Sequence, residues 1–225
     1  MDLIGLKLKK AFEKEGCPIC RLLEEFEDSQ IETVLYEHVN DPEVRKLFSE
    51  SLGLCTRHAW KILQKSQSNP LLGPLGVAVI YEHVLSLYIN SLKSGEDIGE
   101  GRCFLCNLLQ EKETDIIEDV ARRINQLIDT YLHSSSLLCR RHYRMLFKKL
   151  GEKDKKRLEE VQLEKLKTLR MGLNEFVESF DYHTDTPDFN KFWTVKRTIE
   201  ALKGREVVLS LSHERKRRGR AFWVR

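Results

Sequence analysis

Apolar residues recur every three or four positions along most of the chain, the spacing that predicts amphipathic α-helices. The predicted helices cover residues 2–14, 20–39, 42–51, 55–63, 75–92, 106–131, 139–150, 153–181 and 189–203. The run 75–92 is apolar around most of its circumference, which predicts a central and buried helix. The run 153–181 contains a seam that steps by three and four residues, as expected for a helix that packs on another helix. Its members are Leu166, Leu169, Leu173, Phe176 and Phe180. The pattern therefore predicts an all-α protein.

The last residues have a different pattern. Two strand-like runs, 207–211 and 221–224, flank the basic segment 212–219. This arrangement predicts a short C-terminal β-hairpin with a basic loop. A disordered basic tail over 205–225 is the alternative interpretation.

One motif, Cys-x-x-Cys followed at a distance by Cys-x-x-His, occurs twice and contains all six cysteines of the chain. The Cys-x-x-Cys pair recurs 86 residues later and the Cys-x-x-His pair 84 residues later. The first copy consists of Cys17, Cys20, Cys55 and His58, and the second of Cys103, Cys106, Cys139 and His142. The chain therefore contains an internal repeat.

Two ligands separated by two residues lie within one turn of each other and can bind the same ion. Three thiolates and one imidazole form a Cys₃His set, a common structural zinc site with all four positions filled. We therefore predict two tandem helical repeats, each clamped by its own Cys₃His site and holding one structural Zn²⁺. The predicted divisions are repeat 1–94, linker 95–102, repeat 103–186, closing helix 187–204 and tail 205–225. The sequence also leaves open a crossed arrangement of the ligand pairs.

The six cysteines could have roles other than zinc binding, and the sequence favours some of these over others. An iron–sulfur cluster is the main alternative, since thiolates with one histidine can hold one. Disulfides are disfavoured, because each repeat has three cysteines and would leave one unpaired. Buried free cysteines would not gather in two matching sets, and a redox Cys-x-x-Cys pair needs a βαβ context that the pattern lacks.

Composition and charge favour no particular partner. The chain is 41% hydrophobic and 32% charged, with a formal net charge of +3. No stretch reaches the roughly 18 consecutive apolar residues of a membrane helix, and the N-terminus lacks the order of a signal peptide. We therefore expect a cytoplasmic protein with no membrane partner.

No catalytic constellation stands out, since the sequence has neither a P-loop nor a Gly-x-Ser-x-Gly motif. A Cys₃His zinc site also leaves no position for a reactive water. We therefore favour a non-enzymatic, metal-stapled helical scaffold that binds a macromolecular partner. An iron–sulfur redox protein is one alternative function. RNA or DNA binding is the other, because two segments are rich in basic residues. These residues are Arg140, Arg141, Arg144, Lys148 and Lys149 in one helix, and Arg215, Lys216, Arg217, Arg218 and Arg220 in the tail.

The paired motifs, with leucine before each Cys-x-x-His at Leu54 and Leu138, and the closing run from Trp193 to Gly204, resemble a known family. It is a bacterial and archaeal family of duplicated CxxC and LCxxH proteins, a domain of unknown function. The resemblance covers roughly residues 10–204. It implies the same eight ligands and no established activity, substrate or cofactor.

Overall fold

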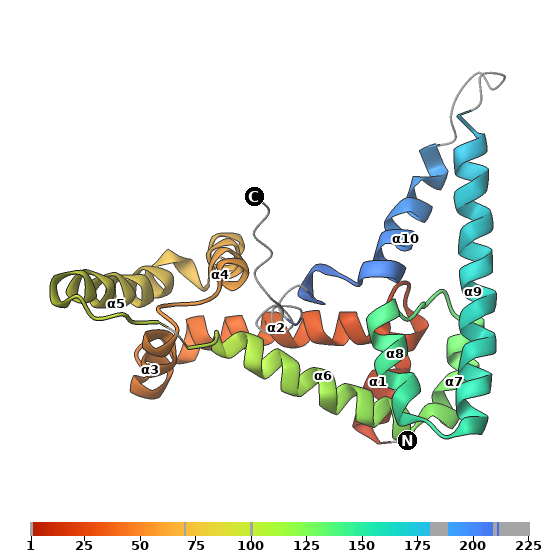
Figure 1. Ribbon diagram of the computed structural model, residues 1–225, viewed down its shortest axis with the longest axis horizontal. Helices are drawn as coiled ribbons and strands as arrows, with labels where there is room; N and C mark the ends of the chain where they lie inside the picture. The colour runs from red at the N-terminus through yellow and green to blue at the C-terminus, as the bar shows by residue number, and fades with distance from the viewer. Residues whose placement is uncertain (1, 70, 100, 181–188, 209–210, 212–225) are drawn as a thin grey trace, which may run out of the picture. The chain divides into compact units, whose positions relative to one another are not determined.

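The computed structural model describes residues 2–69, 71–99, 101–180, 189–208 and 211 (Figure 1). In these ranges the chain is helical, with no strand and only one isolated bridge, between Gly16 and Ser136. The α-helices are α1 (Leu3–Glu13), α2 (Pro18–Glu37), α3 (Pro42–Glu50), α4 (Thr56–Ser68), α5 (Gly73–Ser94), α6 (Phe104–Arg122), α7 (Ile124–His133), α8 (Arg140–Lys149), α9 (Glu152–Glu178) and α10 (Trp193–Lys203). The prediction of an all-α protein is confirmed.

Short polar residues and glycines set several helix ends. The Asp2 carboxylate accepts the N–H of Gly5 at 2.8 Å and caps α1. Asp41 caps α3 in the same way, and Pro42 occupies the first turn, where its missing N–H costs nothing. At the other end of a helix, Gly95 adopts a left-handed conformation and ends α5.

The predicted C-terminal hairpin finds no support. Its first strand was expected from residue 207, but Glu206–Val208 form a 3₁₀ turn in which Val207 and Val208 are buried. Burial of two consecutive side chains suits a turn that packs both of them better than a strand with opposite faces. The second strand and the basic residues Arg215, Lys216, Arg217, Arg218 and Arg220 lie outside the described residues.

The helices form two compact units that differ from the two sequence repeats. Among the described residues, unit 1 consists of 2–23 and 113–208, apart from 181–188, and unit 2 consists mainly of 24–112. The boundaries at 23/24 and 112/113 fall inside helices, in α2 and in α6. Each unit therefore combines segments from both halves of the chain.

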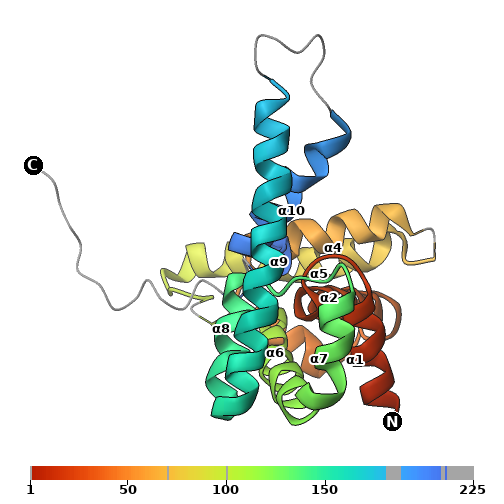
Figure 2. The same ribbon diagram turned by 90° about the vertical axis from the view of Figure 1, so that its right-hand side faces the viewer.

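Unit 1 packs α1 against α7, and α9 against α7 and α10. Phe12 and Tyr131 are fully buried and meet edge to face, with ring centroids 5.8 Å apart. The predicted seam of α9 contacts α10 beside it, as Figures 1 and 2 both show. Leu169 packs with Ala201 of α10, and Phe176 meets Phe192 in the turn that precedes α10, which agrees with the three-and-four spacing. Phe180, at the end of the predicted seam, is 51% exposed.

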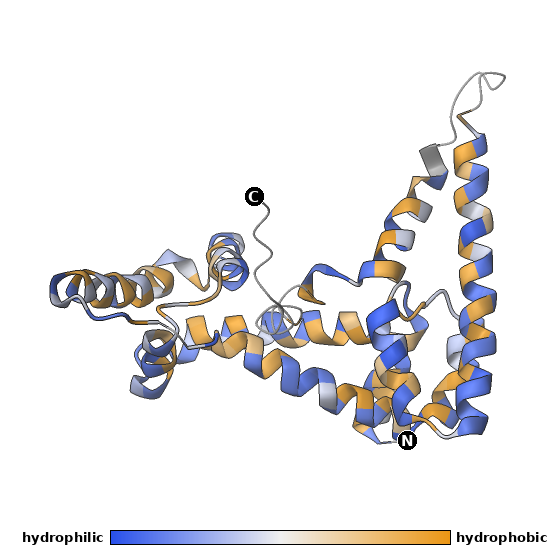
Figure 3. Ribbon diagram, viewed as in Figure 1, coloured by the Kyte–Doolittle hydropathy of each residue, from blue (hydrophilic) through white to orange (hydrophobic). Residues whose placement is uncertain are grey.

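Unit 2 packs α5 against α3 and α4. The prediction that α5 is buried on all sides is wrong, because only Gly76, Val77, Ile80 and Val84 are buried along it. Figure 3 shows that α5 is nevertheless mostly hydrophobic. Its exposed apolar side chains are Leu75, Leu85, Tyr88, Ile89 and Leu92.

By length and composition, α5 could also cross a membrane, contrary to the expectation from the interrupted apolar run. The mean hydropathy of its best 18-residue window is 1.3, and 22% of that window is buried. A helix of a soluble protein passes the same test, and the inner face of α5 belongs to the core of unit 2. The absence of a membrane partner therefore stays a prediction.

Candidate metal centres

The eight predicted ligands lie in two groups of four, but each group draws on both repeats. Cluster A contains Cys17, Cys20, Cys139 and His142, and cluster B contains Cys55, His58, Cys103 and Cys106. The expectation that each repeat carries its own site is therefore wrong. Each Cys-x-x-Cys pair meets the Cys-x-x-His pair of the other repeat, so the arrangement is crossed.

Cluster A lies wholly in unit 1, and all four of its side chains are buried. The Nδ1 atom of His142 lies 3.3 Å from Cys17 Sγ, 3.4 Å from Cys20 Sγ and 3.3 Å from Cys139 Sγ. The Sγ atoms of Cys20 and Cys139 are 3.9 Å apart. One ring nitrogen therefore faces three sulfur atoms.

Cluster B lies wholly in unit 2 and repeats this geometry. His58 Nδ1 lies 3.2 Å from Cys55 Sγ, 3.4 Å from Cys103 Sγ and 3.5 Å from Cys106 Sγ. The Sγ atoms of Cys55 and Cys106 are 3.7 Å apart. Cys55 is only partly buried, so cluster B is the more accessible of the two.

Helix starts position the ligands in both clusters. Cys55 and Cys139 are the N-cap residues of α4 and α8, and their histidines follow within the first turn. Cys17 and Cys103 directly precede α2 and α6. The N–H groups and the partial positive charge of a helix start stabilise nearby thiolates.

Without bound metal, the pKa values of the thiols within each cluster differ. In cluster B, hydrogen bonds from Cys103, Cys106 and His58 lower the pKa of Cys55 below its usual 9.0, although burial opposes this. The pKa of Cys106 is raised, chiefly by its hydrogen bonds with Cys103 and Cys55 and also by burial. Cluster A behaves in the same way, with the pKa of Cys139 lowered and that of Cys20 raised. In each cluster the N-cap cysteine therefore ionises more readily than the second cysteine of the Cys-x-x-Cys pair.

The spacing of the donor atoms fits a single tetrahedral ion. With Zn–S bonds of about 2.3 Å and Zn–N bonds of about 2.0–2.1 Å, a regular tetrahedron places two sulfurs about 3.8 Å apart and a sulfur and a nitrogen about 3.6 Å apart. One sulfur–sulfur pair in each cluster, at 3.7 Å in cluster B and 3.9 Å in cluster A, matches the first value. The sulfur–nitrogen distances of 3.2–3.5 Å are slightly below the second. All donor atoms within a cluster lie within 4.8 Å of one another.

A buried glutamate holds the second ring nitrogen of His58. Glu27 Oε1 lies 2.8 Å from His58 Nε2, and the Glu27 side chain is fully buried. Arg57 pairs with both carboxylate oxygens, and Lys61 Nζ lies 2.5 Å from Oε2. Burial opposes ionisation of Glu27, but the hydrogen bonds from His58, Arg57 and Lys61 outweigh it and lower its pKa below the usual 4.5. The carboxylate therefore holds a proton on Nε2 and orients Nδ1 toward the three sulfur atoms of cluster B.

Glu113 does the same for His142 in unit 1. Its Oε1 lies 2.9 Å from His142 Nε2, and Arg141 donates to Oε1 and Oε2 at 2.6 Å each. Sequence analysis missed both glutamates, although a signal was present. Each stands ten residues after the first cysteine of its repeat, so Glu27 and Glu113 share the 86-residue offset of the Cys-x-x-Cys pairs.

Another acidic residue that sequence analysis missed supports cluster A from α10. Glu200 Oε1 accepts the backbone N–H of Cys17 at 3.0 Å and the Nε–H of Arg205 at 2.6 Å. Beside it, the N–H of Leu137 donates to the carbonyl of Gly16 at 3.0 Å. The segments that lead into Cys17 and Cys139 are therefore joined, and α10 covers one of them.

The predicted nucleic-acid residues of α8 divide into two groups. Arg141 is bound to Glu113, and Lys149 Nζ lies 2.9 Å from Glu118 Oε1. Arg140, Arg144 and Lys148 are exposed and four residues apart, so they share one face of α8. The structure thus reduces the basic helix to a stripe of three cations.

These features define a helical protein with two buried Cys/His groups suited to metal. The sequence matches the family described as "Family of unknown function (DUF6062)" twice, over residues 1–100 and 88–208. The chain belongs to this family, and the two matches agree with the internal repeat. No curated protein and no solved structure matches the chain.

Proposed function

We propose that the protein is a non-enzymatic helical scaffold in which two Zn²⁺ ions staple the fold and whose surface binds another macromolecule. The main support is the geometry of clusters A and B. Each offers three sulfurs and one nitrogen, mostly buried, at spacings suited to one tetrahedral ion. Four protein ligands fill every position of such an ion and leave none for a reactive water.

The spacing favours a single ion over an iron–sulfur cluster. A cluster of two or four irons separates its protein ligands by more than one ion does. The His–Glu pairs add support, since structural and catalytic zinc sites commonly fix the ligand histidine through a carboxylate. A mononuclear site is therefore the better fit to both clusters.

The experiment is purification without added metal, followed by elemental analysis, an absorption spectrum and thermal melting before and after chelation. We expect about two zinc ions per chain, a colourless protein and loss of cooperative melting on chelation, since structural zinc contributes roughly 10–16 kcal/mol in small zinc-binding peptides. If the protein instead contained iron and absorbed at about 400 nm, the bound group would be an iron–sulfur cluster and not zinc. If the metal-free protein melted at the same temperature as the metal-bound protein, the metal would not stabilise the fold.

The exposed apolar face of α5 supports the binding part of the proposal. Leu75, Leu85 and Leu92 are 74%, 57% and 66% exposed. Exposed apolar patches of this kind mark interaction surfaces more often than chance. In cells, proximity labelling around the wild-type protein should enrich a partner that the variant Leu85→Ser/Leu92→Ser loses. A matched variant on α9, Leu163→Ser/Met171→Ser, should keep it, and equal labelling by all three proteins would argue against α5.

Nucleic-acid binding is the second candidate, supported by the stripe of Arg140, Arg144 and Lys148. No carboxylate lies within ion-pair distance of these three side chains in the described part of the chain, so their charges are available to phosphates. Three phosphate contacts on a duplex would give a salt slope of about −2.7 for the logarithm of the binding constant.

A mobility-shift series in RNA and DNA over a range of salt tests this candidate. The variant with all three stripe residues changed to glutamine should lose the shift. A variant with three exposed lysines changed to glutamine, Lys7, Lys10 and Lys14, removes the same charge elsewhere and should keep it. No shift of the wild-type protein at low salt would eliminate nucleic acid as the partner.

A further inference from the structure

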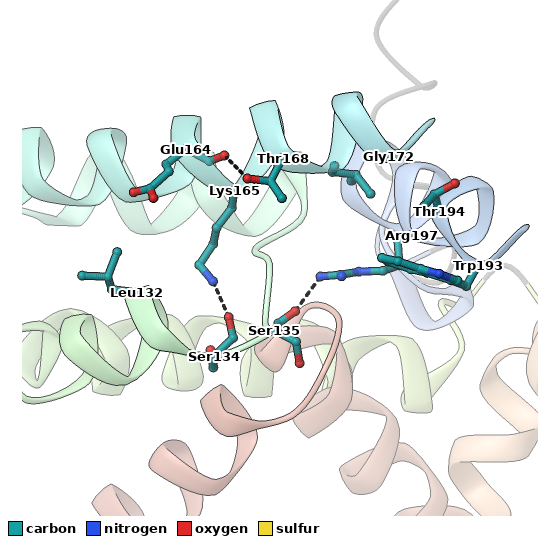
Figure 4. Close-up of a pocket in the computed structure, with 11 residues that line it drawn as sticks. Leu132, Ser134, Ser135, Glu164, Lys165, Thr168, Gly172, Trp193, Thr194 and Arg197 are labelled. Atoms are coloured by element: carbon teal, nitrogen blue, oxygen red, sulfur yellow. Dashed lines mark hydrogen bonds between the residues drawn. The ribbon is translucent and has the colours of Figure 1, made fainter. Parts of the chain in front are cut away.

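A cavity of about 270 Å³ lies in unit 1, between the end of α7, the middle of α9 and the start of α10 (Figure 4). It is separate from clusters A and B, because none of their eight residues lines it. Its walls carry two cationic side chains, Lys165 and Arg197, and one indole ring, Trp193. This combination serves no part of the metal-stapled scaffold.

The two cations meet at one bend of the backbone. Lys165 Nζ donates to the carbonyl oxygen of Ser134 at 2.6 Å, and Arg197 Nη2 donates to that of Ser135 at 2.6 Å. The two carbonyls are consecutive, so the heads of both side chains reach the same place from different helices, as Figure 4 shows. Lys165 also lies 5.0 Å from the centroid of the Tyr131 ring.

Only one of the two cations, Arg197, forms an ion pair with a carboxylate of the described residues. Within the described residues, no carboxylate oxygen lies within 4.0 Å of Lys165 Nζ, and Glu164 points away from it in Figure 4. Arg197 Nε lies 3.2 Å from Glu15 Oε1, whose side chain is 57% exposed, without the alignment of a hydrogen bond. Two like charges in a partly buried place cost free energy that a bound anion would offset.

The protonation of Lys165 agrees with this picture. Burial is the largest effect and the nearby charge of Arg197 the next, and both lower the pKa of Lys165 below its usual 10.5, against a smaller opposing effect of the Glu164 charge. Removing a positive charge from water and placing it beside another disfavours the charged form. An anion between the two cations would favour the charged form of Lys165 and so oppose both effects.

Trp193 adds a flat apolar wall. The indole is 48% exposed, even though the guanidinium of Arg197 lies 5.3 Å from the ring centroid. Exposed indoles beside a cation are suited to stacking with a second planar group. The wall and the cations are therefore complementary to two different parts of one small molecule.

We propose that this cavity binds a small organic anion that carries a planar ring. The carboxylate or phosphate of the ligand accepts hydrogen bonds from Lys165 and Arg197, and its ring lies against Trp193. Nucleoside monophosphates and aromatic carboxylates share this chemistry. The volume of about 270 Å³ is just below the usual range of ligand pockets, roughly 300–1,000 Å³, so the cavity admits only a compact molecule.

Calorimetric titration of the full-length, metal-loaded protein with four probes tests the proposal. Adenosine monophosphate and indole-3-acetate carry both a ring and an anionic group, whereas inorganic phosphate and acetate carry the anionic group alone. We expect at least one ring-bearing probe to bind, and the matching anion without a ring, phosphate or acetate, to bind at least tenfold more weakly. The tighter of the two ring-bearing probes shows whether the natural ligand is a nucleoside monophosphate or an aromatic carboxylate. If neither ring-bearing probe bound at concentrations up to about 5 mM, the binding free energy would be weaker than about −3 kcal/mol and the proposal would be overturned.

Variants locate the binding. Lys165→Met keeps the length of the side chain and removes its charge, and it should weaken the bound probe at least tenfold. Trp193→Leu should weaken the ring-bearing probe and leave the simple anion unchanged. Lys167→Met changes an exposed lysine of α9 outside the cavity and should have no effect. Metal content and melting temperature confirm that each variant is folded, and full affinity in both Lys165→Met and Trp193→Leu would place the ligand elsewhere.

Discussion

The Sγ atom of Cys20 lies 3.9 Å from that of Cys139, although 119 residues separate them in the sequence. Cys55, the partner of Cys20 in the repeated motif, belongs to the other cluster. Each ion is therefore predicted to be held by ligands from both halves of the chain. The ions would join the two repeats within each compact unit instead of closing one repeat each.

Double substitutions distinguish the crossed arrangement from closure within a repeat. Cys20→Ser/Cys139→Ser removes two ligands of cluster A, so about one zinc ion per chain should remain in cluster B. Cys20→Ser/Cys55→Ser damages both clusters, so almost no tightly bound zinc should remain. Elemental analysis of the purified proteins measures both. If the zinc contents of these two variants were exchanged, each ion would be bound within its own repeat.

The single substitution Cys55→Ser should lower zinc from about two ions per chain to about one and destabilise unit 2. Hydrogen exchange should report the loss of protection in residues 24–112. The core of unit 1, including Phe12 and Tyr131, should stay protected, because cluster A is complete without Cys55. Loss of protection over residues 1–23 in place of 24–112 would contradict the division into units.

Glu27→Gln should weaken zinc binding to cluster B about 10- to 100-fold, as loss of the carboxylate behind a ligand histidine commonly does. The amide cannot neutralise Arg57 and Lys61, and it holds His58 less firmly. A competition titration with a coloured chelator measures the change. Glu25→Gln, an exposed substitution on the same helix, is the matched control and should bind zinc as the wild type does.

The His58 ring should titrate far above its usual range when no metal is bound. Burial opposes its charge, but hydrogen bonds with Cys103, Cys55 and Glu27 outweigh it and raise the pKa to about 10. Protonated His58 therefore stabilises the metal-free fold fully below pH 6.5, and this contribution is lost as the pH rises through about 10. The lowered pKa of Cys55 acts in the opposite sense, so the ring itself is the better probe.

Nitrogen-15 spectra of the imidazole rings measure this titration directly. In metal-free protein at pH 7 both ring nitrogens of His58 should be protonated. Zinc should remove the proton from Nδ1 and leave Nε2–H donating to Glu27, so zinc affinity should rise with pH. A metal-free His58 that is neutral at pH 7 would contradict the raised pKa.

Tyr131→Phe should destabilise unit 1 by about 1–3 kcal/mol, the usual cost of leaving buried polar groups unpaired. The Tyr131 hydroxyl accepts the N–H of Leu138 at 3.1 Å and donates to Gln162. Gln162 in turn donates to the carbonyl of Leu138 at 3.0 Å, so the network supports the segment that leads into Cys139. Chemical denaturation measures the loss, and Tyr36→Phe, a change at an exposed tyrosine, should cost less than about 0.5 kcal/mol.

Zinc should leave cluster B before cluster A. Cys55 is partly buried, whereas all four residues of cluster A are buried. A chelator or a thiol reagent therefore reaches cluster B first, and release should show two phases of equal size. Cys55→Ser should abolish the fast phase, and a surviving fast phase would assign the accessible ion to cluster A.

The sequence was sufficient to predict most of the helices and the eight Cys and His residues that gather in the clusters. The single helix predicted over 106–131 is an exception, because the structure divides it into α6 and α7 at Arg123. Helical spacing reflects burial along one face, and ligand spacing reflects the geometry of one turn, so both are local signals. The pairing of the motifs is not local. Either pairing supplies three cysteines and one histidine, so ligand counting could not separate closure within a repeat from the crossed arrangement.

The same distinction applies to the other differences. The composition of α5 predicts that it is apolar, but which sides are covered depends on α3 and α4, whose positions follow from the whole unit. Glu27 and Glu113 were recognisable only by combining the repeat offset with the knowledge that a ligand histidine needs a second partner. The cavity beside Trp193 depends on three helices that meet only after folding.

The crossing of α2 and α6 between the units also bears on how such a chain could arise. A protein with a single repeat would carry one Cys-x-x-Cys pair and one Cys-x-x-His pair that face different sites. With the pairing seen here, it would complete both sites by exchanging segments with a second copy of itself. A duplication that joined two such copies would convert this obligate dimer into one chain, and the present protein has the architecture of a fused, segment-swapped pair.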